Sequence, residues 1–144
     1  MENDLHNFYS LKAKAETVIK SKKPTILYAV NALTKEKTNQ IIYYVLDGVF
    51  YARDGITGAM TNKPLKYRVG TIVYASDAIT GAKTDKILYY IEDGKVFAAD
   101  VLTGNKTNIV LKYIIDKVVY ASDALTYQKT NTILGYIEGD EIMD

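Results

Sequence analysis

Five acidic or amide side chains recur every 23 residues, and their oxygen atoms are the clearest candidates for metal or ligand chemistry in this chain. They are Asn31, Asp54, Asp77, Asp100 and Asp123. Each one opens a turn sequence of the form [DN]-x-[IL]-T, in which an Asp or Asn side chain accepts hydrogen bonds from backbone amides. No unit has the closely spaced D-x-D-x-D oxygen ligands of a calcium loop. We therefore predict a structural turn column and no metal site.

Residues for nucleophilic or acid-base catalysis are scarce. The chain has one histidine, His6, and no cysteine, so a histidine dyad has little support and a thiol nucleophile is excluded. The serines have no base near them in the sequence, and no G-x-S-x-G, Walker or G-x-G-x-x-G motif occurs. We expect no catalytic residues, no cofactor and no enzymatic activity.

Tyrosine is the most conspicuous residue type, with 13 copies in a chain that has no tryptophan. Nine of them belong to two columns of the 23-residue period. The first column is Tyr28, Tyr51, Tyr74, Phe97 and Tyr120, and the second is Tyr44, Tyr67, Tyr90, Tyr113 and Tyr136. Because the second column does not vary, we expect it to lie in the core.

A variable column directly precedes the invariant tyrosines. It reads Tyr43, Lys66, Tyr89, Lys112 and Gly135. Its variation favours a solvent-facing surface, on which an aromatic and basic stripe would contact a partner. Together with Tyr127, the first four residues are the candidate binding residues.

The leading hypothesis is a structural scaffold that binds a protein partner or itself, and the alternative is a carbohydrate-binding module that uses repeated Tyr, Asp and Asn side chains.

Each 23-residue unit contains two segments rich in β-branched and aromatic residues, which predicts two strands per unit. The tight dipeptides Asp47-Gly48 and Asp93-Gly94 predict hairpin turns. In the second segment, the variable positions near its start and those near its end have opposite parity, so they would lie on opposite faces of a regular strand. This change of parity predicts a bulge or bend between them. The glycine that closes the first turn is replaced by Lys35 and Tyr127 in the outer units, as expected at the ends of a finite array.

The fold class follows from these elements. We predict an all-β domain over residues 24–144, in which five hairpins form a curled antiparallel sheet or a closed meander barrel. The units lie near 26–48, 49–71, 72–94, 95–117 and 118–140. A β-solenoid would stack the Asp column at about 4.8 Å, where like charges repel, and a propeller of two units per blade would not close. These two folds are the alternatives.

Residues 1–23 predict an N-terminal amphipathic helix that caps the array, because Phe8, Leu11, Ala15 and Val18 form an apolar stripe.

The 18 basic and 17 acidic residues give a net charge of +1, which argues against nucleic acid and membrane surfaces as partners. The N-terminus has no apolar segment of signal-peptide length, so we expect a cytoplasmic location by default.

Overall fold

The computed structural model describes residues 23–141, and within them all regular structure is β. Ten strands alternate in length between short and long. They are β1 (Thr25–Val30), β2 (Lys37–Leu46), β3 (Val49–Arg53), β4 (Met60–Val69), β5 (Ile72–Ser76), β6 (Lys83–Glu92), β7 (Lys95–Ala99), β8 (Lys106–Ile115), β9 (Val118–Ser122) and β10 (Lys129–Glu138). Each 23-residue unit thus forms one hairpin of a short strand and a long strand.

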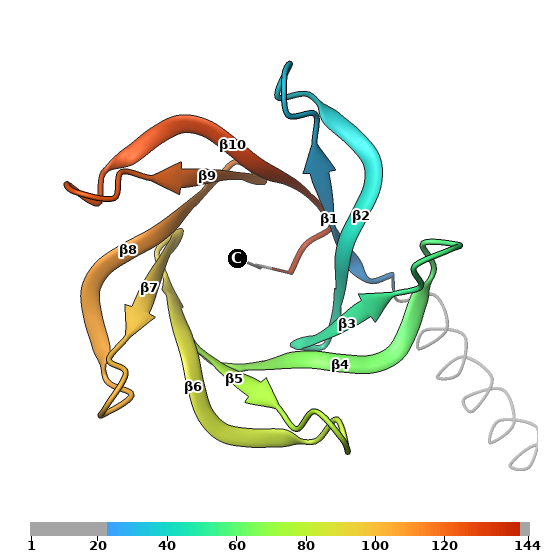
Figure 1. The fold of residues 1–144 in the computed structure, drawn as a ribbon, viewed down its shortest axis with the longest axis horizontal. Coiled ribbons are helices and arrows are strands. Elements are labelled where there is room, and N and C mark those ends of the chain that lie inside the picture. Colours follow the sequence, from blue (N-terminus) through green and yellow to red (C-terminus); the bar gives the residue numbers. More distant parts are fainter. Residues whose placement is uncertain (1–22, 142–144) are drawn as a thin grey trace, which may run out of the picture.

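The strands form a closed antiparallel barrel in which each strand pairs with its neighbours in sequence. Figure 1 shows the five hairpins around a central axis, with their loops at the periphery. Closure is made by β1 and β10, where Leu27 pairs with Ile137. The predicted closed meander barrel is confirmed, and the open sheet, the solenoid and the propeller are not observed. The predicted N-terminal helix lies outside the described residues.

A bulge occurs at the same place in every hairpin. In the first one, Leu27 pairs with Tyr43 and Tyr28 pairs with Ile41, so Ile42 has no partner across the ladder. The equivalent unpaired residues are Ile42, Leu65, Leu88, Leu111 and Leu134. This confirms the bulge predicted from the change of parity. Pro64 lies beside the second bulge, but it does not cause it, because the four units without proline have the same bulge.

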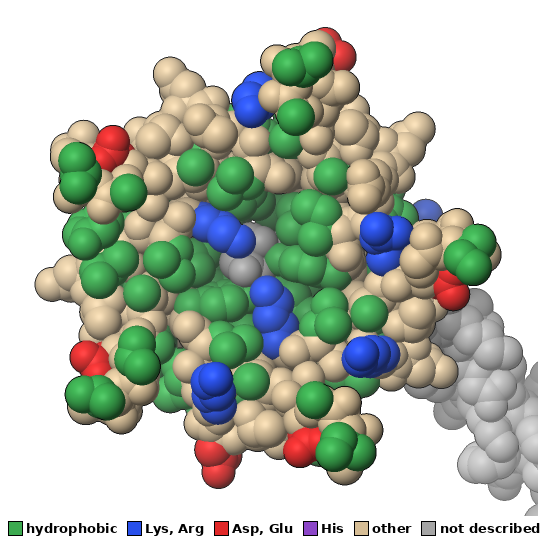
Figure 2. All heavy atoms as spheres, viewed as in Figure 1, with side chains coloured by type: hydrophobic (Ala, Val, Ile, Leu, Met, Phe, Trp, Pro, Cys, Tyr) green, Lys and Arg blue, Asp and Glu red, His purple; other side chains and the backbone are tan. Residues whose placement is uncertain are grey.

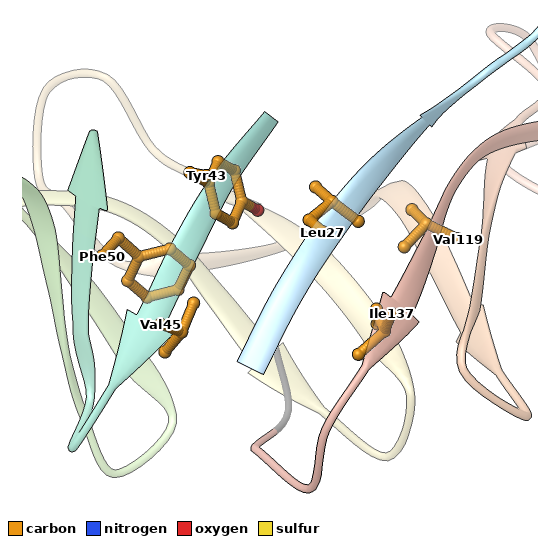
Figure 3. Packing of buried hydrophobic residues seen from close by; sticks show 6 residues of the cluster. All are labelled: Leu27, Tyr43, Val45, Phe50, Val119 and Ile137. Carbon is orange, nitrogen blue, oxygen red and sulfur yellow. The ribbon is translucent and has the colours of Figure 1, made fainter. Parts of the chain in front are cut away.

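One column of the core comes from the short strands and faces the barrel lumen. It consists of Leu27, Phe50, Val73, Val96 and Val119, which are 0 to 6% exposed. Figure 3 shows Leu27, Phe50 and Val119 pointing into the same space as residues from β2 and β10. Full burial of one such side chain contributes roughly 1.5–3 kcal/mol.

The invariant tyrosines join neighbouring units. Tyr90 donates a hydrogen bond from its hydroxyl to the carbonyl oxygen of Gly104, in the loop of the next unit, at 2.7 Å. The corresponding bonds are Tyr44 to Gly58, Tyr67 to Gly81, Tyr113 to Tyr127 and Tyr136 to Lys35. Most of these rings are half buried, so the column lies at the contacts between units rather than in the lumen. The bond each hydroxyl makes explains why phenylalanine does not replace tyrosine there.

The first aromatic column lies under lysine side chains. The Lys37 ammonium is 3.7 Å from the centroid of the Tyr28 ring, a cation-π contact. Lys83, Lys106 and Lys129 make the same contact with Tyr74, Phe97 and Tyr120 at 3.8 to 4.0 Å. The second unit has Met60 in this position. These lysines therefore cover aromatic rings of the barrel wall.

Candidate functional site

Side chains of the Asp column organise the outer loops. The Asp77 Oδ1 atom accepts hydrogen bonds from the amides of Ile79 at 2.8 Å and Thr80 at 2.9 Å. The hydrogen bond from the Thr80 amide has the largest effect and that from the Ile79 amide the next, and both lower the pKa of the Asp77 carboxyl below its usual value. Asn31, Asp54, Asp100 and Asp123 make the same pair of bonds in their own loops. All five loops thus have one fixed backbone geometry.

An aliphatic side chain stands almost fully in solvent on each of these loops. In the middle unit it is Ile79, which is 95% exposed although its own amide is held by Asp77. The equivalent residues are Leu33 at 93%, Ile56 at 97%, Leu102 at 94% and Leu125 at 90%. We call these five side chains the loop tips. Figure 2 shows hydrophobic and acidic side chains together at the periphery of the ring, where these loops lie.

Grooves separate the loop of one unit from the long strand of the unit before it. The groove between β4 and the loop after β5 has a volume of about 440 Å³, with Asn62 on one wall and Ile79 on the other. Its equivalent between β6 and the loop after β7 has a volume of about 450 Å³, with Asp85 and Leu102 on its walls. The repeat therefore presents the same combination of a polar wall and an apolar tip more than once.

Four of the candidate binding residues come together at the barrel axis. Tyr43, Lys66, Tyr89 and Lys112 share one inward position of the long strands, and Tyr43 is only 8% exposed. The Lys66 ammonium is 5.0 Å from the Tyr43 ring centroid and 4.9 Å from that of Tyr89. In Figure 2 two basic side chains lie in a central hollow ringed by hydrophobic side chains.

This orientation differs from the solvent-facing stripe expected from the sequence. The extra residue at the bulge resets the alternation, so Tyr43 faces the same side of the sheet as its partner Leu27, which is the lumen. Tyr127 lies apart from the other four. It is 37% exposed on an outer loop, where its carbonyl oxygen accepts the hydrogen bond of Tyr113.

The loop tips are the prominent surface residues that sequence reasoning missed. Their signal was present, because every unit has Ile or Leu two residues after the Asp or Asn. An aliphatic residue kept inside a tight turn has no neighbouring segment to pack against. Its exposure could have been predicted from the turn geometry alone.

No group of three metal-binding side chains occurs among residues 23–141. In that same part of the chain, no helix has the length and hydropathy needed to cross a lipid bilayer. Comparison with protein-family models, curated proteins and solved structures gave no match for this chain.

Proposed function

We propose that this chain is a non-catalytic scaffold that binds a protein partner through its outer loops. The observation that carries the proposal is the set of five loop tips, each 90 to 97% exposed and each on a loop of the same geometry. Isolated apolar residues on a surface are ordinary, but an Ile or Leu at the same position of five equivalent loops forms a repeated apolar feature that suits contact with a partner.

The loops are suited to binding because they are ordered before a partner arrives. The Asp77 side chain fixes two amides, and the Tyr67 hydroxyl donates to the carbonyl oxygen of Gly81 from the neighbouring unit. A loop that is held in one conformation loses little conformational entropy on binding. Burial of one Ile or Leu side chain in a partner would contribute roughly 1.5–3 kcal/mol.

The arrangement of the loops around a ring favours multivalent contact. Five equivalent loops can engage repeated sites on one partner, so that modest single contacts add to a strong one. The closed barrel also removes one route to self-association, because β1 and β10 pair with each other and leave no strand edge among the ten strands for a second copy. Self-association, if it occurs, would use the loop tips.

The test compares two triple variants with the wild-type chain. Ile56→Ser, Ile79→Ser and Leu102→Ser together remove three loop tips, whereas Asn62→Ser, Asp85→Ser and Asn108→Ser change exposed positions of the long strands. Photo-crosslinking from position 79 identifies a partner, which is then purified. Binding to that purified partner, measured by calorimetry, is expected to weaken more than 100-fold in the loop variant and less than threefold in the control.

Sedimentation velocity of the same three proteins distinguishes a foreign partner from a second copy. Association of the wild-type chain that the loop variant loses would make the partner another copy of this chain. Equal binding by the loop variant and the wild-type chain, in both experiments, would refute the proposal. Neither triple variant is expected to change thermal stability much, because all six side chains are exposed.

Carbohydrate binding is the alternative proposal, and the polar walls of the two grooves are what favour it. Asn62 and Asp85 are exposed there and lie opposite an apolar side chain. The other repeated polar groups are engaged within the barrel, since the Asp77 carboxylate and the Tyr90 hydroxyl both make hydrogen bonds there. A glycan array on which the wild-type chain binds and the Asn62→Ser, Asp85→Ser, Asn108→Ser variant does not would favour carbohydrate over protein.

A further inference from the structure

One of the four turns that connect neighbouring units contains no glycine. The turns after β2, β4 and β6 are Asp47-Gly48, Gly70-Thr71 and Asp93-Gly94, whereas the turn after β8 is Asp116-Lys117. Asp116 and Lys117 have φ angles of 50° and 65°, so two consecutive residues with a Cβ atom lie in the left-handed region. This region favours glycine, because a Cβ atom there crowds the backbone. The turn between the fourth and fifth units is therefore strained.

The equivalent glycines show how little room the turn leaves for a Cβ atom. A Cβ atom added at Gly48 would lie 2.7 Å from the carbonyl oxygen of Arg68, and one added at Gly94 would lie 2.7 Å from that of Ile114. Lys117 is equivalent to Gly94 in the repeat, and the carbonyl oxygens of both residues accept a hydrogen bond from the long strand that follows them. Lys117 thus places a Cβ atom where two other units have none.

The residues around this turn have the composition of a single strand. They read Tyr-Ile-Ile-Asp-Lys-Val-Val-Tyr over residues 113–120, with six β-branched or aromatic residues and no glycine or proline. Such residues favour extended backbone. Asp116 and Lys117 are exposed, so straightening of the turn takes neither side chain out of the core. The turn can therefore open into one continuous strand that joins β8 to β9.

The fifth hairpin, formed by β9 and β10, is bounded on its other side by the closure of the barrel, where no turn joins the strands. There β10 pairs with β1, and Tyr136 lies opposite Tyr28. The same two tyrosine columns meet between β8 and β9, where Tyr113 lies opposite Tyr120. Both sides of the fifth hairpin thus make the contact that every pair of neighbouring units makes. The β1 strand of a second copy offers the same contact as the β1 strand of the same chain.

We propose that two copies of this chain exchange their fifth hairpins, residues 118–140, so that β9 and β10 of each copy insert between β8 and β1 of the other. Such an exchange keeps the contacts of both barrels and changes only the turn at Asp116-Lys117, where it relieves backbone strain. It begins only when a barrel opens, whereas contact between closed barrels would use the loop tips. This inference does not depend on the function of the loops.

A cysteine pair across the closure distinguishes this exchange from other kinds of dimer. The chain has no cysteine of its own, and Ile26 and Glu138 lie opposite each other on β1 and β10. Residues opposite each other on antiparallel strands are about 4.5–5.5 Å apart, a separation that a disulfide spans. In the Ile26→Cys, Glu138→Cys variant of the full chain, a closed barrel forms the disulfide within one chain, whereas exchanged barrels form it between two chains.

The double-cysteine variant is refolded from urea at high protein concentration under reducing conditions. The dimer is then isolated by size-exclusion chromatography, diluted and oxidised. Non-reducing denaturing electrophoresis is expected to show covalently linked dimers. Dimers without a link between their chains, or no dimer at all, would refute the exchange. Protein that is oxidised before the urea step is expected to remain monomeric, and an equal yield of dimer from it would also refute the exchange.

Two substitutions at Lys117, each made in the double-cysteine variant, test the strained turn as the hinge. Lys117→Gly removes the Cβ atom and restores the Asp-Gly turn of other units, so the yield of linked dimer is expected to fall at least tenfold. Lys117→Ala removes the same charge but keeps the Cβ atom at positive φ, so its yield is expected to stay within twofold of that with lysine. Equal yields from the glycine and alanine variants would overturn the role of the turn.

Discussion

The hydroxyl of Tyr136 donates a hydrogen bond to the carbonyl oxygen of Lys35 at 3.0 Å, across 101 residues of sequence. It is the same bond that Tyr90 makes to Gly104 between neighbouring units, at 2.7 Å. The last unit therefore contacts the first as any unit contacts the next. The first and last units of the repeat are therefore neighbours in the barrel, and neither forms a free end.

This equivalence gives a direct test of ring closure. Tyr136→Phe and Tyr90→Phe each remove one hydroxyl and leave one carbonyl without that donor, so each is expected to lower the free energy of unfolding by about 1 kcal/mol. Urea denaturation followed by circular dichroism measures both. In an open array the Tyr136 bond would not exist, so a loss at Tyr90 alone would contradict closure.

The second prediction concerns the loops of the two outer units. Lys35 and Tyr127 have φ angles of 66° and 62°, whereas the equivalent Gly81 has a φ of 75°. This left-handed region is unfavourable for residues with a Cβ atom. Lys35→Gly and Tyr127→Gly are each expected to stabilise the barrel by about 0.5–1 kcal/mol, because relief of backbone strain outweighs the added entropy of the unfolded chain.

Gly81→Ala is the control for these two variants. It introduces a Cβ atom at positive φ, and that atom would lie 3.1 Å from the Cδ atom of Pro64. The variant is expected to lower the melting temperature, while the two glycine variants raise it. A lower melting temperature for Lys35→Gly would show that its lysine side chain contributes more than its backbone strain costs.

The general architecture was readable from the sequence, because it depends on local chemistry. The 23-residue period, the two strands per unit and the dipeptide Asp93-Gly94 all specify hairpins through turn geometry and β propensity. The bulge was one of the two features, a bulge or a bend, that the change of parity predicted. Lys35 and Tyr127 were expected to mark atypical ends, but their loops keep the geometry of the others.

Closure and the direction of the Tyr43 column were harder to predict, for two physical reasons. Closure depends on contacts between β1 and β10, such as Tyr28 with Tyr136, which are the most distant in sequence. The direction of Tyr43 depends on which residue is bulged, because a shift of one residue moves a side chain to the other face of the sheet. A bulge at Tyr43 instead of Ile42 would have changed the face that this column occupies.

The third prediction is a dependence of stability on acid pH. The carboxyl groups of the Asp column have lowered pKa values because they accept amide hydrogen bonds, the first of them from a Thr amide in each loop. A pKa lowered by folding contributes stability above the unfolded value of about 3.9, and this contribution is lost as the pH falls through the folded pKa. We expect stability to be level from about pH 7 to pH 5 and to decline below about pH 4.

Asn31 supplies the matched control for this pH dependence. Its Oδ1 atom accepts the same two amide hydrogen bonds at 2.9 and 3.0 Å without a titratable group. A variant with Asp54→Asn, Asp77→Asn, Asp100→Asn and Asp123→Asn should therefore keep its loops and lose less stability between about pH 5 and pH 2 than the wild-type chain. Parallel stability curves of the two proteins over this interval would contradict the assigned role of the carboxylates.

The last prediction concerns the seam at which the described chain ends. The Glu141 carboxylate accepts hydrogen bonds from the amides of Asp47 at 2.7 Å and Gly48 at 3.0 Å, and its own amide donates to the Thr25 hydroxyl at 3.0 Å. After β10 the chain turns toward the barrel axis (Figure 1), which places Glu141 on the turn between β2 and β3. Its carboxylate thus connects the end of the last unit to the turn between the first and second units.

Glu141→Ala is expected to lower the free energy of unfolding by about 1–2 kcal/mol, because two turn amides lose a charged acceptor. Asp140→Ala is the neighbouring control. The Asp140 side chain is fully exposed and lies 3.7 Å from the Lys117 ammonium, a surface ion pair that contributes little. Amide hydrogen exchange adds a local readout, since Glu141→Ala should speed exchange at Asp47 and Gly48 before it affects the centre of β6. Equal stability of the two variants, with unchanged exchange at that turn, would show that the seam is held by the β1 and β10 ladder alone.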